Sequence, residues 1–180
     1  DFRIESSELS VINFPNLETA PNTFTIYSSN IDSLNFDNLS NANSITIHYN
    51  SGISGNTFEL NTFNNITSLQ GVQIENNNNL SHIGGFSALS WINSLNVTSN
   101  LQLESCCMLL ELAYISDYAN INSNGSSCSS LLEIGLNCDD AQYCGTSSST
   151  TYINNQDELD SLEGCTELLG HWYFIGNDYT

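Results

Sequence analysis

The stretch Ser44-Ile45-Thr46-Ile47-His48 decides the fold, because its pattern returns along the chain. A second copy is Gly71-Val72-Gln73-Ile74-Glu75, and related copies occupy residues 23–27, 94–98 and 119–122. The copies are anchored on Ile26, Ile47, Ile74, Val97 and Ile121, so the steps in sequence number are 21, 27, 23 and 24. Self-similarity at this period predicts a solenoid, in which each unit is one coil that buries its apolar edge by stacking on its neighbours.

The alternation within each copy predicts which side chains point inward, because a strand places successive side chains on opposite faces. The predicted inward set is Phe24, Ile26, Ile45, Ile47, Val72, Ile74, Leu95 and Val97. The predicted outer-face ladder is Thr25, Thr46, Gln73, Asn96 and Asn120. An earlier coil is expected around Ile4, which precedes Ile26 by a step of similar size.

A polar corner follows each strand, and a lone aliphatic residue is expected to point inward after it. These aliphatic residues are Ile31, Ile53, Leu80 and Leu101. Asparagine suits such corners because it tolerates left-handed backbone and bonds to neighbouring backbone groups. Asparagines at the same corner of successive coils, such as one of Asn76 to Asn79, are expected to stack as a ladder. The alternative interpretation of that run is a plain polar loop.

The charge excludes several classes of partner. One basic residue, Arg3, stands against 20 acidic ones, so the net charge is −19. Such a surface repels nucleic-acid phosphates and anionic lipid. No run of about 18 apolar residues is present, so membrane insertion is not expected. Hydrophobic content of 39% and aromatic content of 10% favour a folded core over a disordered acidic chain.

Six cysteines lie in the C-terminal part of the chain: Cys106, Cys107, Cys128, Cys138, Cys144 and Cys165. An even number in an acidic, Asn-rich chain predicts disulfides and an oxidising compartment, although six cysteines allow 15 pairings. Two short helices are expected beside them, over 107–113 and within 128–138, with Ser129 or Ser130 as the cap of the second. The adjacent cysteines Cys106 and Cys107 do not form a Cys-x-x-Cys motif, so redox catalysis is not expected.

The domain prediction follows from where the period stops and restarts. Residues 1–140 are predicted to form a right-handed parallel β-solenoid, whose last apolar layer is covered by the disulfide-pinned helical cap. Residues 141–151 are predicted to be a Ser/Thr-rich linker, and Asp1 is expected to be a mature or internal start. The strand pattern restarts at Ile153 and recurs one coil period later at Ile175, so 152–180 are predicted to be the first coils of a following module or to pack on a neighbouring copy. Ile153, Trp172 and Tyr173 are the predicted inter-module contacts.

A known family has similar motifs. Ser105-Cys106-Cys107, Cys128-Ser-Ser-Leu-Leu-Glu-Ile and Cys138, together with the stretch from Tyr152 to Gly164-Cys165-Thr166, resemble the receptor L-domain-like, leucine-rich β-helix modules of secreted Bacteroidetes surface proteins. In that family the cap has a cysteine pair, a strand, a third cysteine, a short helix and a fourth cysteine. The resemblance implies a secreted or cell-surface, non-catalytic module, often in tandem within adhesin-like chains whose neighbouring copies are its partners.

Other functions remain as alternatives. A carbohydrate-binding module is the second hypothesis, with a platform formed by Tyr27, Tyr49, Trp91, Trp172 and Tyr173. An ice-binding face needs a regular Thr ladder, which ends after Thr46, and a polysaccharide-active enzyme needs two carboxylates about 5–9.5 Å apart. An enzyme is therefore not expected.

Metal and modification sites are weakly indicated. His48, His82 and His171 have no ligand spacing, so no cofactor or metal role is expected. Weak Ca²⁺ binding at Asp139-Asp140 or Asp157-Glu158-Asp160 stays open beside a solvated loop. Five Asn-x-Ser/Thr sequons are surface glycosylation candidates: Asn38, Asn65, Asn79, Asn96 and Asn124.

Overall fold

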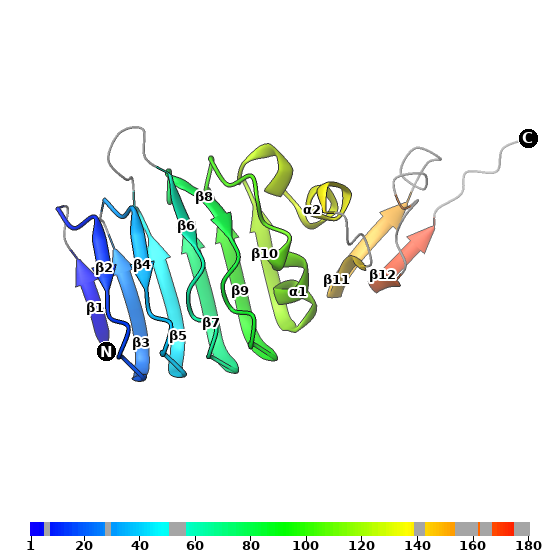
Figure 1. Cartoon of the computed structure of the whole chain (residues 1–180). Coiled ribbons are helices and arrows are strands. Elements are labelled where there is room, and N and C mark those ends of the chain that lie inside the picture. Colours follow the sequence, from blue (N-terminus) through cyan, green and yellow to red (C-terminus); the bar gives the residue numbers. More distant parts are fainter. Residues whose placement is uncertain are drawn as a thin grey trace, which may run out of the picture.

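The chain folds into a parallel β-solenoid of about five turns (Figure 1). A computed structural model describes residues 1–5, 8–27, 30–50, 57–138, 143–153, 162 and 167–174. One face is a six-stranded, all-parallel sheet. Its strands, in spatial order, are β1 (Phe2–Glu5), β3 (Thr19–Tyr27), β5 (Asn41–His48), β7 (Ser68–Glu75), β9 (Trp91–Thr98) and β10 (Ser116–Asn122).

Shorter strands line another side of the stack. The strands β2 (Val11–Asn13) and β4 (Ser33–Asn35) form one parallel pair, and β6 (Phe58–Leu60) and β8 (Leu80–Ile83) form another. The apolar core lies between these pairs and the six-stranded sheet. Within the part of the chain that the structure describes, no helix is long and apolar enough to cross a membrane.

The strand copies predicted from the sequence are confirmed. Each predicted strand lies within β3, β5, β7, β9 or β10, and each predicted inward residue is buried. The register aligns the anchors directly, so that Ile26 pairs with Ile47, Ile47 with Ile74, and Ile74 with Val97. The unequal steps of the sequence period are therefore compatible with a regular sheet.

A row of stacked phenylalanines runs along the solenoid, buried at Phe36, Phe63 and Phe86 and 45% exposed at Phe14. Phe14, Phe36, Phe63 and Phe86 stack in series, with ring centroids 5.8, 5.7 and 5.4 Å apart. Phe24 meets Phe36 edge-on at 4.7 Å. Each aromatic pair contributes about 0.5–1.5 kcal/mol beyond the burial of its area. The row therefore ties successive coils together through one residue type.

One predicted inward position is wrong. Leu101 is 66% exposed, whereas Leu103 is fully buried. The backbone explains the shift, because the buried aliphatic residue follows a corner asparagine by three positions. The Leu103 amide donates to the Asn100 carbonyl at 3.0 Å, as the Leu80 amide donates to Asn77 at 3.2 Å. Ile31 and Leu80 are buried as predicted, and Ile53 lies outside the described residues.

A cap (residues 106–138) covers the last layer of the stack, as the sequence predicted. It contains α1 (Met108–Tyr114), β10, the 3₁₀ turn η1 (Ser126–Cys128) and α2 (Leu131–Asn137). Ser130 caps α2, because its side chain accepts from the Glu133 amide at 3.2 Å. Four buried residues of α1 face the core: Leu109, Leu110, Leu112 and Ala113.

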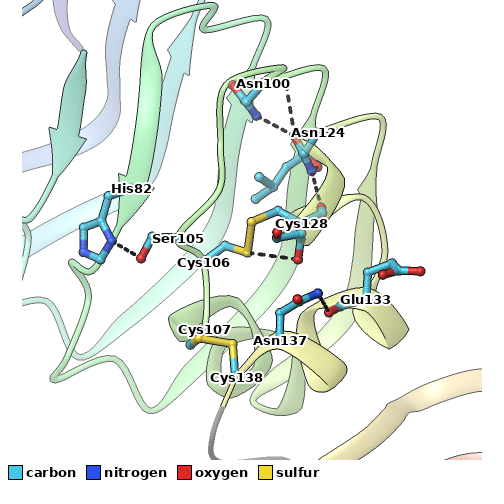
Figure 2. Close-up of a disulfide and its surroundings, with 12 residues drawn as sticks. His82, Asn100, Ser105, Cys106, Cys107, Asn124, Cys128, Glu133, Asn137 and Cys138 are labelled. Carbon is cyan, nitrogen blue, oxygen red and sulfur yellow. Dashed lines mark hydrogen bonds between the residues drawn. A yellow bond between two sulfur atoms is a disulfide. The ribbon is translucent and has the colours of Figure 1, made fainter. Parts of the chain in front are cut away.

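Two disulfides hold the segments of the cap together (Figure 2). They join Cys106 to Cys128 and Cys107 to Cys138, across sequence separations of 22 and 31 residues. In the chain-entropy model, loops of this size each contribute about 3–4 kcal/mol of stability. Disulfides of this kind indicate an oxidising, non-cytoplasmic environment.

Beyond the cap, the Ser/Thr-rich stretch differs from the linker predicted over 141–151. Residues 143–151 belong to β11 (Tyr143–Ile153), which pairs in parallel with β12 (Glu167–Phe174). Serine and threonine favour a linker by composition, but Thr150 to Ile153 are strand-forming residues whose backbone groups are satisfied by β12. β11 contacts α1, α2 and β10, at the cap end of the stack (Figure 1). The side chain of Cys144 and all of Cys165 lie outside what the structure describes.

Candidate functional site

The outer face of the six-stranded sheet carries the predicted ladder in one line. The register joins Thr25 to Thr46, Thr46 to Gln73, Gln73 to Asn96 and Asn96 to Asn120. All five residues are half-buried, because neighbouring strands flank them. The row changes from hydroxyls to amides after the second coil, so it does not offer the repeated threonines of an ice-binding face.

Next to this row the outer face is hollowed. A parallel row of small residues runs through Ser44, Gly71 and Ser94 and ends at Tyr118 on β10. A shallow depression of about 310 Å³ lies over these small residues and is lined also by Thr46, Gln73 and Asn96. Tyr118 is 57% exposed beside it. The depression is lined by hydroxyl and amide groups, with an aromatic ring next to it.

The amides of the outer face are ordered by a relay of hydrogen bonds. Asn122 donates to the Oδ1 of Asn120 at 2.6 Å, and Asn120 donates to the Oδ1 of Asn96 at 2.8 Å. Asn96 donates in turn to the Glu75 carboxylate. Because each side chain is oriented by the next, little entropy remains to be lost when a ligand binds.

Carboxylates on this face are far apart. Glu75 shares a row with Glu5, and the strands β3 and β5 lie between them. Three strand spacings place the two residues about 14 Å apart, since neighbouring strands lie about 4.8 Å apart. That separation exceeds the roughly 5–9.5 Å between the two carboxylates of glycosidases.

The aromatic residues that the sequence grouped into one platform are separated. Tyr27 and Tyr49 cluster with His48, with ring centroids 4.6–5.5 Å apart. Trp91 lies at the opposite end of its strand, where it pairs with Ser68. Tyr173 is exposed in β12, and the Trp172 side chain lies outside the described set.

Burial lowers the pKa of His48 below its ordinary value of 6.5, while Glu75 opposes this shift and Arg3 adds to it.

The three histidines lie on three different strands, β5, β8 and β12. His82 contacts the Ser105 hydroxyl at 2.7 Å (Figure 2). Among the described residues, no group of three His, Cys, Asp or Glu could hold a metal ion. Both acidic clusters considered for Ca²⁺, Asp139-Asp140 and Asp157–Asp160, lie outside the described residues.

Inside the solenoid, the corner asparagines form a buried ladder. Asn50 donates from Nδ2 to Oδ1 of Asn77 at 2.7 Å, Asn77 donates to Asn100 at 3.0 Å, and Asn100 donates to Asn124 at 3.0 Å. The first three are fully buried and Asn124 is 8% exposed. Within Asn76 to Asn79, the ladder prediction therefore holds for Asn77.

Three of the ladder asparagines, Asn77, Asn100 and Asn124, also bind the backbone of the preceding coil. The Oδ1 of each accepts from the amide N–H of the asparagine one coil before, at 3.0–3.3 Å. The Nδ2 of each reaches a carbonyl of the preceding coil at 2.9–3.0 Å; the acceptors are Ile47, Ile74 and Val97. The residue before each ladder asparagine has a left-handed backbone: Tyr49, Asn76, Ser99 and Ser123, with φ of 55–60°. This conformation turns the corner and aims the amide along the stack.

The glycosylation candidates divide by burial. Asn38 and Asn65 are exposed, and Asn96 is half-buried within the outer row. Asn79 and Asn124 are buried, and their Nδ2 atoms donate to the carbonyls of Ile31 and Val97. The prediction of surface sites is wrong for these two residues. Each is buried, and the Nδ2 atom to which a glycan would be attached is already hydrogen-bonded to a backbone carbonyl inside the solenoid.

Comparison with known proteins adds no relative: no family model, no curated protein and no solved structure matches this chain. Function is therefore inferred from the residues and their geometry.

The internal ladder is the feature that sequence reasoning found only in outline. Its signal was present, since an asparagine follows the last inward aliphatic residue by three positions in four coils. The four asparagines are Asn50, Asn77, Asn100 and Asn124. Counting from the strand would have separated these structural asparagines from the exposed ones.

Proposed function

We propose that this chain is a non-catalytic extracellular module of structural and adhesive type, one of a tandem surface protein or fibre. The observation that carries the proposal is the strand pair beyond the cap. Ile153 pairs in parallel with Phe174, and their separation in sequence equals that of the paired anchors Ile26 and Ile47 in the first stack. A β-stack that restarts after a cap is what a chain of modules requires.

The sequence around this second pair supports the same interpretation. Three residues after Ile153 and Phe174 come Gln156 and Asn177, which are amides at the spacing of the internal ladder. Both lie outside the described residues. Stacked coils, an internal ladder and disulfides give a stiff rod that resists local opening, which suits a load-bearing surface protein.

The partner we infer is a neighbouring copy of the same module. Within the described residues β12 pairs only with β11, so its other edge can accept a further parallel strand. Two copies that each carry a charge of −19 repel one another. Association should therefore strengthen as salt screens this repulsion.

Sedimentation velocity of the full chain tests the proposal over a range of protein and salt concentrations. We expect end-to-end oligomers whose size increases with protein concentration and with salt concentration, and elongated particles in electron micrographs. Tyr173→Lys places a charge on the β12 edge and should weaken association. Tyr118→Lys changes an equally exposed tyrosine on the outer face and should not. A chain that stays monomeric throughout, or equal effects of the two variants, would contradict the proposal.

A carbohydrate-binding role is the second candidate, and the depression over Gly71 is the observation that favours it. Its hydroxyls, its ordered amides and the neighbouring Tyr118 suit a neutral glycan, whereas the net charge disfavours anionic ones. Gly71→Thr fills the floor without strain, because an added Cβ would meet only the Ser94 carbonyl oxygen, at 3.7 Å.

Calorimetry with neutral oligosaccharides selected on a glycan array tests this second role. Gly71→Thr and Tyr118→Lys should each abolish binding, and Gln102→Thr, on an exposed turn, should leave it unchanged. Binding that survives Gly71→Thr would remove the depression as the site.

A further inference from the structure

The end of the asparagine ladder coincides with a chemically labile dipeptide. Asn124-Gly125 is the only Asn-Gly in the sequence. In such a pair the backbone nitrogen of glycine readily attacks the asparagine side-chain carbon, and heat-stable proteins tend to contain fewer asparagines. This dipeptide therefore calls for a structural explanation.

The fold demands both residues. Asn124 ends the ladder with four side-chain hydrogen bonds: two accepted from Asn100, and one each donated to the carbonyls of Val97 and Cys128. At Gly125, an added Cβ would lie 2.1 Å from the Leu103 carbonyl oxygen. No residue with a side chain fits there unless the backbone moves.

The closed cap prevents the attack. The Gly125 amide donates to the Asn100 carbonyl at 3.1 Å, so the nucleophilic nitrogen is engaged by the preceding coil. The side chain it would attack is buried and held by its four hydrogen bonds. Figure 2 shows Asn124 between Asn100 and the Cys106–Cys128 disulfide.

That disulfide holds the segment in place. The Cys128 amide donates to the Gly125 carbonyl at 2.8 Å, and the Cys128 carbonyl accepts from Asn124 at 3.2 Å. The Cys106–Cys128 bond ties this turn to the previous coil. The second disulfide, Cys107–Cys138, anchors the end of α2 and makes no such contact with the dipeptide.

We propose that Asn124 is a deamidation site that the Cys106–Cys128 disulfide keeps closed. A small thiol reduces the disulfide to two cysteines and is itself oxidised to its disulfide. In the opened turn the Gly125 nitrogen loses its proton and bonds to Cγ of Asn124, and ammonia leaves. Water then opens the succinimide ring to aspartate or isoaspartate, so the net reaction consumes one water and releases one ammonia.

The product cannot restore the cap. A carboxylate has no N–H to donate, so the Val97 and Cys128 carbonyls lose their donor and face a buried, negatively charged oxygen instead. Isoaspartate also adds a carbon to the backbone beside the position where Gly125 touches Leu103. A transient opening of the cap thus becomes permanent. The aspartate or isoaspartate at position 124 remains after the reductant is gone.

Peptide mass spectrometry of the full chain, incubated with and without a small thiol in mildly alkaline buffer, tests the proposal. Deamidation at Asn124 should be at least about tenfold faster in the reduced protein, because local opening controls access to the site. Two exposed asparagines that precede a serine, Asn43 and Asn93, are internal references whose rates should not change. Asn50-Ser51, at the other end of the ladder, should also stay unchanged if opening is confined to the cap.

Paired cysteine variants assign the effect to one disulfide. The double variant Cys106→Ser/Cys128→Ser should deamidate at Asn124 without thiol. Cys107→Ser/Cys138→Ser keeps the first disulfide and should stay protected until thiol is added. If the first variant fails to fold, the second variant and the wild-type comparison still decide the question. Equal rates of deamidation at Asn124 in the oxidised and reduced wild type would overturn the proposal. Rapid deamidation without thiol in Cys107→Ser/Cys138→Ser but not in Cys106→Ser/Cys128→Ser would overturn it as well.

Discussion

The asparagine ladder makes a strong and specific contribution to stability, and Asn100→Ala measures it. The Asn100 side chain is fully buried and makes five hydrogen bonds. Two are accepted from the backbone and side chain of Asn77, and the two N–H groups of Nδ2 are shared among three acceptors, the carbonyls of Ile74 and Thr98 and Oδ1 of Asn124. The alanine variant leaves these partners without a replacement.

The magnitude follows from the number of bonds. Each buried hydrogen bond contributes about 0.5–1.5 kcal/mol net, and the Thr98 carbonyl is partly accessible to water, so the loss should be about 3–5 kcal/mol. Whole domains are stable by only about 5–15 kcal/mol. With a typical urea dependence of about 2 kcal/mol per molar, the unfolding midpoint should fall by about 2 M.

Urea denaturation followed by circular dichroism is the assay. Asn93→Ala, on the exposed part of β9, is the control and should change stability by less than about 0.5 kcal/mol. The double variant Asn77→Ala/Asn100→Ala should lose less than the sum of the single losses, because the two residues share bonds. A loss at Asn100 no larger than that of the control, or strict additivity with Asn77, would refute the ladder as a cooperative element.

Three further outcomes are expected. Replacing Cys106 and Cys128 together by serine should lower the free energy of unfolding by about 3 kcal/mol in oxidising buffer, measured by denaturant titration. Burial lowers the pKa of His48, so the unfolded chain binds its proton more readily, and stability should fall as the pH drops through 6.5; NMR titration should give His48 a pKa below that value. Gly85→Ala should lower the melting temperature by several degrees, because its Cβ would lie 2.1 Å from a backbone oxygen, whereas Gly71→Ala should leave it nearly unchanged.

Strand positions and faces could be predicted from the sequence because the strand period is local. Ile45 and Ile47 flank Thr46, and this alternation alone assigns the buried face. The helix α2 of the cap could likewise be predicted from Ser130 and the apolar residues after it. These features depend on nearest neighbours in the sequence.

Properties that depend on contacts between coils could not be predicted from the sequence. The exposure of Leu101 and burial of Leu103 depend on how the backbone leaves Asn100. The burial of Asn79 and Asn124 depends on the carbonyls of other coils, so a sequon alone gives no sign of it. The end of β11 at Ile153 was predicted, but residues 143–151 were assigned to a linker, because their composition resembles one and their partner, β12, lies a whole coil further along the chain. In each case the deciding partner lies in another part of the chain.

The ladder also explains how coils of different length stack in one register. Asn77 and Asn100 precede the next buried leucine by three positions, but Asn50 precedes Phe58, which is the partner of Leu80, by eight. The extra residues of the longest coil thus lie between Asn50 and Phe58, while Ile47 still pairs with Ile74 and Asn50 still bonds to Asn77. An insertion there does not disturb the sheet, because the Asn50–Asn77 hydrogen bond before it and the Phe58–Leu80 pairing after it fix the register. The four coils that carry the ladder therefore share an inward apolar pair followed three residues later by a buried amide, while their lengths vary.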